Sequence, residues 1–151
     1  MPQIEVNRNV ASWAEALDPK YRYIFIKGGR TSGKSHEVAG YLSERSFLEK
    51  GLKTVCLREI QKSIKHSSRT LIEQKLKDML DFNKYYKPVE SEIRKIYDSD
   101  DGLFLFQGMN DLTKDNVKSL EDFDIAWFEE SQNASFSTLK TFRPIIRKAG
   151  S

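Results

Sequence analysis

The feature that most limits the possible folds is a glycine-bracketed stretch, Gly28-Gly29-Arg30-Thr31-Ser32-Gly33-Lys34-Ser35. It fits G-x-x-x-x-G-K-[ST], a loop whose backbone N–H groups surround phosphate oxygens. Glycines at Gly28 and Gly33 permit that curl because they have no Cβ. In such loops the lysine, here Lys34, faces the β- and γ-phosphates, and the hydroxyl of Ser35 is a Mg²⁺ ligand. The sequence therefore predicts that residues 28–35 bind ATP with Mg²⁺.

The residues on either side of this loop have the pattern that the motif requires. Tyr23–Ile26 is an apolar, β-prone run, which predicts a buried first strand over Tyr21–Ile26. After the loop, helical spacing separates Val38, Tyr41, Leu42, Arg45 and Leu48. Gly51 is a suitable stop for the predicted helix. Thr54–Arg58 reads as a second strand, so that the helix is a right-handed crossover between parallel strands. We expect an α/β fold of the phosphate-loop nucleoside-triphosphatase type, with a mostly parallel sheet flanked by helices.

The middle of the chain predicts a helix and an added antiparallel hairpin. Apolar spacing favours a helix over Ser63–Phe82. Its basic face could contact a phosphate backbone or simply be solvated, and charge runs are usually solvated. That face consists of Lys62, Lys65, His66 and Arg69. Two β-prone runs, Glu92–Tyr97 and Leu103–Phe106, flank a turn of three aspartates and Gly102. Turn chemistry, with a positive φ at Gly102, explains these aspartates better than a metal site.

An apolar strand ending in two carboxylates supplies the second half of the chemistry. In open α/β sheets ligands bind at the carboxyl ends of strands. Asp124 opens the run Phe123–Glu130 and is therefore expected to be structural, whereas Glu129 and Glu130 close it. We expect Glu129 to hold Mg²⁺ together with Ser35, and Glu130 to position the attacking water. Arg30 could stabilise the γ-phosphate or hold the loop through a local carboxylate. Arg143 and Arg147 are candidates for arginine fingers that act on a neighbouring subunit.

Bulk properties allow one α/β domain. The 151 residues suffice for one core, with a polar N-terminal segment over 1–20 and the nucleotide domain over 21–151. A net charge of +3 means that nucleic-acid contact would need a local patch. Cys56 is the only cysteine, and we expect a buried thiol. No apolar stretch is long enough to span a membrane.

The glycine loop and the run Asp124–Glu130 together resemble the ATPase domain of the large terminase subunit of tailed bacteriophages. Supporting stretches are Leu57-Arg58-Glu59, Lys118-Ser119-Leu120-Glu121 and Pro144–Lys148. The resemblance implies an ATPase that drives double-stranded DNA into a capsid, in the host cytoplasm. It also implies a small terminase subunit, a portal ring and further copies of the chain as partners. By this resemblance Glu130 is the catalytic glutamate, Glu129 the Mg²⁺ ligand and Arg30 the loop arginine.

The chain departs from that family in length. Family members have a further strand, which lies between the phosphate-loop strand and the acidic strand, and then a nuclease domain. Without that strand the two would sit about 9–10 Å apart, twice the usual spacing. We therefore expect a missing central strand, no nuclease activity, and either a piece of a longer protein or a truncated product with impaired hydrolysis.

Two other classes of function remain open on the sequence. One is another phosphate-loop enzyme, such as a helicase-like ATPase or a nucleotide kinase, although no arginine-rich lid is evident. The other is a nucleotide- or DNA-binding module that does not hydrolyse ATP. DNA-stimulated ATP turnover would separate the packaging motor from both.

Overall fold

The computed structural model describes residues 24–26, 32–58, 68–109 and 117–129 of the chain. Its elements follow one another as helix, strand, two helices and four further strands, with one short 3-10 turn. In chain order they are α2 (Lys34–Leu48), β1 (Lys53–Arg58), α4 (Ser68–Met79), α5 (Phe82–Tyr85), β2 (Tyr86–Pro88), β3 (Glu92–Lys95), η1 (Tyr97–Ser99), β4 (Leu103–Gly108) and β5 (Ile125–Phe128).

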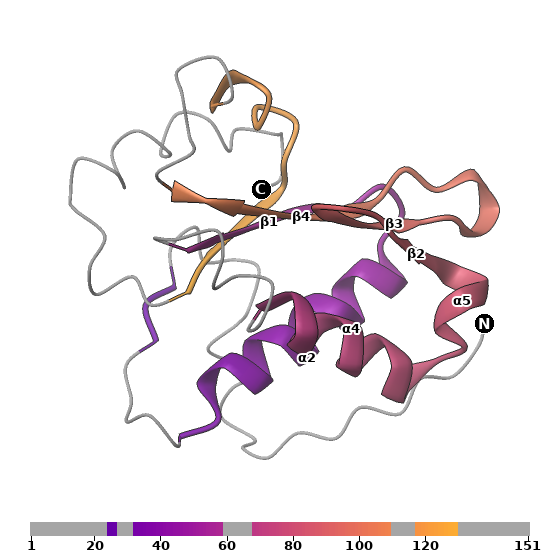
Figure 1. Ribbon diagram of the computed structural model, residues 1–151, viewed down its shortest axis with the longest axis horizontal. Helices are drawn as coiled ribbons and strands as arrows, with labels where there is room; N and C mark the ends of the chain where they lie inside the picture. Colours follow the sequence, from indigo (N-terminus) through magenta and orange to yellow (C-terminus); the bar gives the residue numbers. More distant parts are fainter. Residues whose placement is uncertain (1–23, 27–31, 59–67, 110–116, 130–151) are drawn as a thin grey trace.

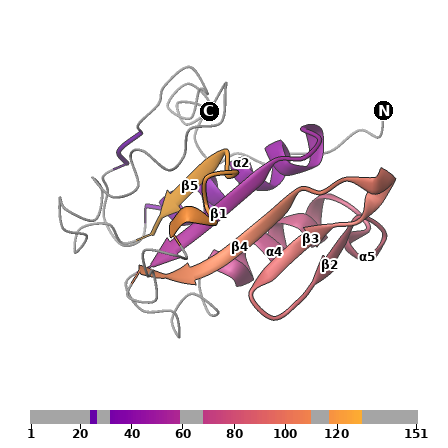
Figure 2. The same cartoon turned by 90° about the horizontal axis from the view of Figure 1, so that it is seen from above.

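The strands form one five-stranded sheet in the order β2-β3-β4-β1-β5 (Figure 2). β1 runs parallel to both of its neighbours, with Cys56 opposite Phe106 of β4 and Trp127 of β5. The other half is antiparallel, because β3 pairs with β2 on one side and with β4 on the other. The predicted fold class, an α/β sheet with parallel strands and an added antiparallel hairpin, is therefore confirmed.

Both faces of this sheet are covered by apolar side chains. Helices α2, α4 and α5 lie against one face (Figure 1). The core on that side includes Leu42 of α2, Ile72 and Leu76 of α4, and Cys56 of β1. Because side chains alternate along a strand, the β1 residues next to Cys56 point the other way. Val55 and Leu57 pack there against Leu120 and Phe123.

One predicted strand does not form where it was expected. Residues 24–26 belong to no strand, and Phe25 is 77% exposed. A strand needs a neighbour for its N–H and C=O groups, and within the described sheet the strand at the expected edge, β5, pairs only with β1. The prediction of a buried strand is therefore wrong for residues 24–26, and residues 21–23 lie outside the described residues.

The middle of the chain matches the prediction in type but differs in detail. Of the predicted helix over 63–82, residues 63–67 lie outside the described residues, α4 covers Ser68–Met79, and Phe82 belongs to the separate helix α5. The hairpin of β3 and β4 is confirmed. However, the positive φ values in its turn belong to Asp98 and Ser99, not to Gly102.

Gly102 is needed for space instead of backbone freedom. A Cβ there would approach the Asp100 carboxylate to 3.0 Å and the Leu52 carbonyl oxygen to 3.1 Å. These distances are tighter than ordinary side-chain packing allows. The backbone N–H of Gly102 donates to Asp100 Oδ1 at 2.8 Å, the local turn bond expected of an aspartate.

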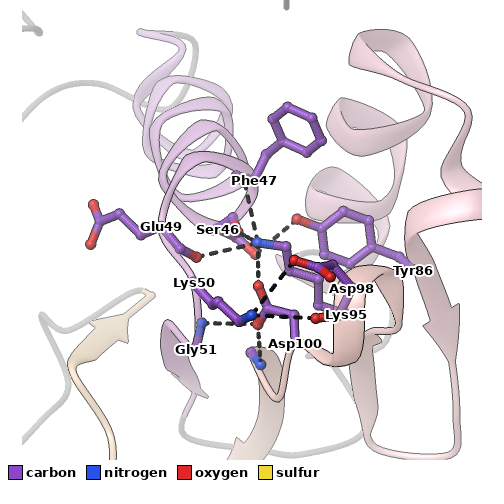
Figure 3. Close-up of polar contacts among 10 residues, drawn as sticks. Ser46, Phe47, Glu49, Lys50, Gly51, Tyr86, Lys95, Asp98 and Asp100 are labelled. Carbon is purple, nitrogen blue, oxygen red and sulfur yellow. Dashed lines mark hydrogen bonds and ion pairs between the residues drawn. The ribbon is translucent and has the colours of Figure 1, made fainter. Parts of the chain in front are cut away.

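A buried ion pair fastens the end of α2 to the hairpin (Figure 3). The Lys95 ammonium lies 2.7 Å from Asp100 Oδ2, and the two side chains are only 7% and 4% exposed. The same ammonium donates to the carbonyl oxygens of Ser46, Phe47 and Glu49 at 2.8, 3.2 and 3.3 Å. These carbonyls carry the negative end of the helix dipole. Lys95 therefore caps the C-terminal end of α2.

Two further bonds complete this attachment. Asp100 Oδ1 accepts the N–H of Gly51 at 2.9 Å, and the hydroxyls of Ser46 and Tyr86 lie 3.0 Å apart. Burial raises the pKa of Tyr86, so its hydroxyl keeps its proton.

None of the described helices is long and apolar enough to cross a lipid bilayer.

Candidate functional site

The end of the glycine loop that the structure describes leads directly into α2. Gly33 is the N-cap residue, with φ 76° and ψ 4°, and its carbonyl oxygen accepts the N–H of Glu37 at 3.0 Å. A Cβ at Gly33 would meet nothing within 4 Å. The left-handed backbone, and not a lack of space, is therefore what requires glycine here. This is the backbone freedom that the sequence predicted for Gly33.

The next two loop residues form the first turn of α2. Lys34 Nζ donates to the hydroxyl of Ser32 at 3.2 Å, and Ser35 is half-buried. The unpaired N–H groups and the positive dipole end of a helix attract anions. Lys34 adds a full positive charge at the same end. A phosphate group would therefore meet backbone donors and an ammonium together.

Glu129 directly follows β5 and is held in place from two directions. Its N–H donates to the carbonyl oxygen of Leu57 at 3.0 Å, which fixes its backbone to β1. Its side chain is only 8% exposed, and the hydroxyl of Ser68 donates to its Oε2. Burial, and then the negative charge of Glu129, raise the pKa of the Cys56 thiol well above its ordinary value. Cys56 is thus a buried, protonated thiol, as expected.

Asp124 lies at the other end of β5 and has a structural role. Its Oδ2 accepts the N–H of Lys53 at 2.9 Å, and its own N–H donates to the carbonyl oxygen of Lys53 at 2.9 Å. Both bonds fix the start of β5 beside the start of β1. The expectation that Asp124 is structural is therefore met.

The loop end and Glu129 belong to the same edge of the sheet. The C-terminal end of α2 is fastened near the start of β1 through Lys95 and Asp100. From there α2, with 15 residues, extends about 22 Å, and β1, with 6 residues, extends about 20 Å. Figure 1 shows the beginning of α2 and the ends of β1, β4 and β5 on the same side of the molecule.

Several predicted site residues lie outside the described residues: Gly28, Gly29, Arg30, Thr31, Glu130, Arg143 and Arg147, together with Lys62, Lys65 and His66 of the basic face. Arg69, the remaining residue of that face, is engaged within the protein. Its guanidinium donates to the carbonyl oxygens of Glu90 at 2.5 Å and Val89 at 2.8 Å. It also lies 5.9 Å from the centre of the Phe106 ring. Arg69 thus holds the turn between β2 and β3. The sequence had left open a contact with a phosphate backbone or a solvated side chain, and the Arg69 guanidinium instead binds backbone carbonyls of the protein.

Sequence reasoning did not find Ser68, which contacts the carboxylate directly. The helix predicted over Ser63–Phe82 contains Ser68, but its apolar spacing carries no signal for a buried hydroxyl. The two partners are separated by 61 residues, so no local pattern connects them.

The oxygen donors available here suit Mg²⁺. Within the described residues no group of three or more His, Cys, Asp or Glu side chains converges. Mg²⁺ does not require such a cage, because it commonly binds one or two carboxylates with phosphate oxygens and water. A serine hydroxyl at the start of α2 and the buried carboxylate of Glu129 are hard oxygen ligands of that kind.

Comparison with known proteins relates the chain to a protein family and to a solved structure. A family model described as phage terminase large subunit matches residues 20–151. The crystal structure of a large terminase from a thermophilic bacteriophage is similar, with a TM-score of 0.64 and 12% sequence identity. That match covers 82% of this chain and 30% of that chain, and at such identity it shows the fold alone. The comparison with curated proteins finds no match.

Proposed function

Because the chain belongs to the phage terminase large subunit family, which is a family of ATPases, we propose that it binds and hydrolyses ATP to drive double-stranded DNA into a capsid. The observation that carries the proposal is the buried carboxylate of Glu129 at the end of β5. It belongs to the sheet edge to which α2 brings Gly33 and Lys34.

The chain's own residues divide the work of binding and hydrolysis. Residues 28–35 surround the phosphates with N–H groups, and Lys34 neutralises the β- and γ-phosphate charge. Ser35 and Glu129 would hold Mg²⁺, which would supply positive charge against the negative charge that develops on the phosphate oxygens. Glu130 orients the attacking water, and Arg30 stabilises the γ-phosphate.

The partners follow from the family rather than from any contact in the chain. We propose double-stranded DNA, a small terminase subunit and a portal protein as partners in the host cytoplasm, with several copies of the chain acting in a ring. The part of the basic face that the structure describes, Arg69, is occupied by backbone carbonyls. DNA contacts are therefore to be sought on other residues.

The test is nucleotide binding by the purified chain, measured with a fluorescent ATP analogue and Mg²⁺. A charged hydrogen bond is worth about 1.5–3 kcal/mol, which is about 10- to 150-fold in Kd. We expect Lys34→Ala to raise the Kd by that factor while the circular dichroism spectrum stays the same. Turnover of ATP with and without double-stranded DNA then tests the motor assignment.

A matched control is Lys50→Ala, because Lys50 is an exposed lysine beyond the opposite end of α2. It should bind the analogue as the unaltered chain does. Equal affinity in Lys34→Ala and the unaltered chain, or an equal loss in both variants, would contradict the proposed site.

A further inference from the structure

Ser68 is a buried hydroxyl that no part of the proposed mechanism uses. It lies in the first turn of α4, is fully buried, and donates a hydrogen bond to Oε2 of Glu129. The backbone of Glu129 is fixed by its N–H bond to Leu57, but that bond does not determine where the carboxylate points. The hydroxyl of Ser68 restricts that orientation, because Oε2 must stay within hydrogen-bonding distance of it.

The helix that carries Ser68 also packs against the helix that carries Lys34. Ile72 and Leu76 of α4 share a core with Val38 and Leu42 of α2. The hydroxyl and the proposed phosphate-binding turn are therefore mounted on two helices that contact each other. A shift of α4 relative to the sheet would change the orientation of Glu129.

We propose that Ser68 is a positioning residue: its hydroxyl orients the Glu129 carboxylate toward the metal of a bound metal–nucleotide complex. This inference rests on the proposed function, since it assigns Glu129 to Mg²⁺. Partners that orient a metal ligand in this way are typically worth about 10- to 100-fold in metal affinity. A serine that only satisfies a buried anion would affect stability without changing metal affinity.

The experiment compares Ser68→Ala with the unaltered chain, with Mn²⁺ as the paramagnetic probe in the presence of ADP. Electron paramagnetic resonance gives the Kd for Mn²⁺, and a fluorescent analogue gives the Kd for nucleotide without metal. We expect the Mn²⁺ Kd to rise at least about 10-fold, with metal-free nucleotide affinity within about twofold. An unchanged Mn²⁺ Kd in a variant that binds nucleotide normally would overturn the proposal.

Ser43→Ala is the matched control. Ser43 is also fully buried, and among the described residues its hydroxyl has no hydrogen-bond partner. It should change neither affinity. Ser68→Cys, which nearly preserves the shape but donates weakly, keeps the test decisive if Ser68→Ala does not fold, and it too should raise the Mn²⁺ Kd.

A further variant links the effect to its partner. In a Glu129→Gln background, Ser68→Ala should cause no additional loss of Mn²⁺ affinity, because the carboxylate through which it acts is gone. A full additional loss would show that Ser68 acts elsewhere and would overturn the proposal. If the unaltered chain binds neither nucleotide nor Mn²⁺ with ADP, the proposed function itself fails, and this inference fails with it.

Discussion

The buried ion pair of Lys95 and Asp100 joins the C-terminal end of α2, Gly51 and the hairpin of β3 and β4. Burial alone would raise the pKa of Asp100. The hydrogen bond from Lys95 and those from the N–H groups of Gly102 and Gly51 outweigh it, so that the pKa is lowered. A charge in this environment is stabilising only while its partners remain, because an unpaired buried ion has a large desolvation cost.

We predict that Asp100→Asn lowers the free energy of unfolding at pH 7 by about 3–5 kcal/mol, the usual cost of breaking a buried pair. The lowered pKa fixes the sign of the pH dependence. The contribution of Asp100 is complete above its unfolded-state pKa of about 3.9 and is lost as pH falls through the lower folded-state pKa. Denaturant unfolding at pH 7, 4 and 3 should therefore show the difference between the two proteins shrinking with acidity.

Asp98→Asn is the control for that series, because Asp98 is exposed and lies 3.6 Å from Lys50 in a solvated pair. Its effect at pH 7 should stay within about 0.5 kcal/mol. A gap between Asp100→Asn and the unaltered protein that stays constant down to pH 3 would contradict the role given to the Asp100 charge.

Among the elements, those set by local pattern were predicted well. The spacing of apolar residues predicted the helix after the glycine loop, the strand β1 and the hairpin of β3 and β4. The structure contains each of these elements. Residues 24–26 have an equally good strand pattern, yet a strand depends on a neighbour that no local pattern supplies. The three-residue strand β2 ends in Pro88 and was missed, since so short a run carries almost no signal.

The candidate site likewise contains residues that local pattern predicts and one residue that it does not. The rule that ligands bind at the carboxyl ends of strands predicted a ligand-binding role for Glu129 and a structural role for Asp124. Sequence order alone shows which of the two residues lies at the carboxyl end of the strand. Ser68 could not be found in this way. Its contact with Glu129 depends on how α4 packs against the sheet, which is a property of the tertiary fold.

The helix α2 offers a direct test of backbone conformation against helix propensity. Gly33→Ala should destabilise the protein by about 1–2 kcal/mol, because a side chain is unfavourable in the left-handed region. Gly40→Ala, in the interior of the same helix, should stabilise it by about 0.5–1 kcal/mol. A Cβ at Gly40 would meet only Lys75 Cδ, at 4.0 Å. Thermal unfolding followed by circular dichroism measures both, and the same sign for the two variants would refute the assignment.

At the scale of the whole molecule, β1 is the strand on which both cores depend. Its Cys56 belongs to the core under the helices, and its Val55 and Leu57 belong to the core on the opposite face. The two cores differ in size but share this strand. We therefore expect the molecule to unfold as one cooperative unit.

Truncation of a fully buried leucine on each face tests that expectation. Leu76→Ala under the helices and Leu120→Ala on the other face should each lower stability by about 2–5 kcal/mol. Hydrogen exchange should show the β1 amides losing the same protection in both variants. If Leu120→Ala left the protection of β1 unchanged, the smaller core would be an independent unit.

The attachment of α2 by Lys95 has a mechanical consequence. A rod about 22 Å long that is clamped at one end behaves as a lever, and a swing of about 5° at the clamp displaces the other tip by about 2 Å. The clamp lies beside Gly51, and the tip carries Lys34. Because Val38 and Leu42 also hold α2 against α4, a force on that tip would load this core as well as the salt bridge at the opposite rim of the sheet.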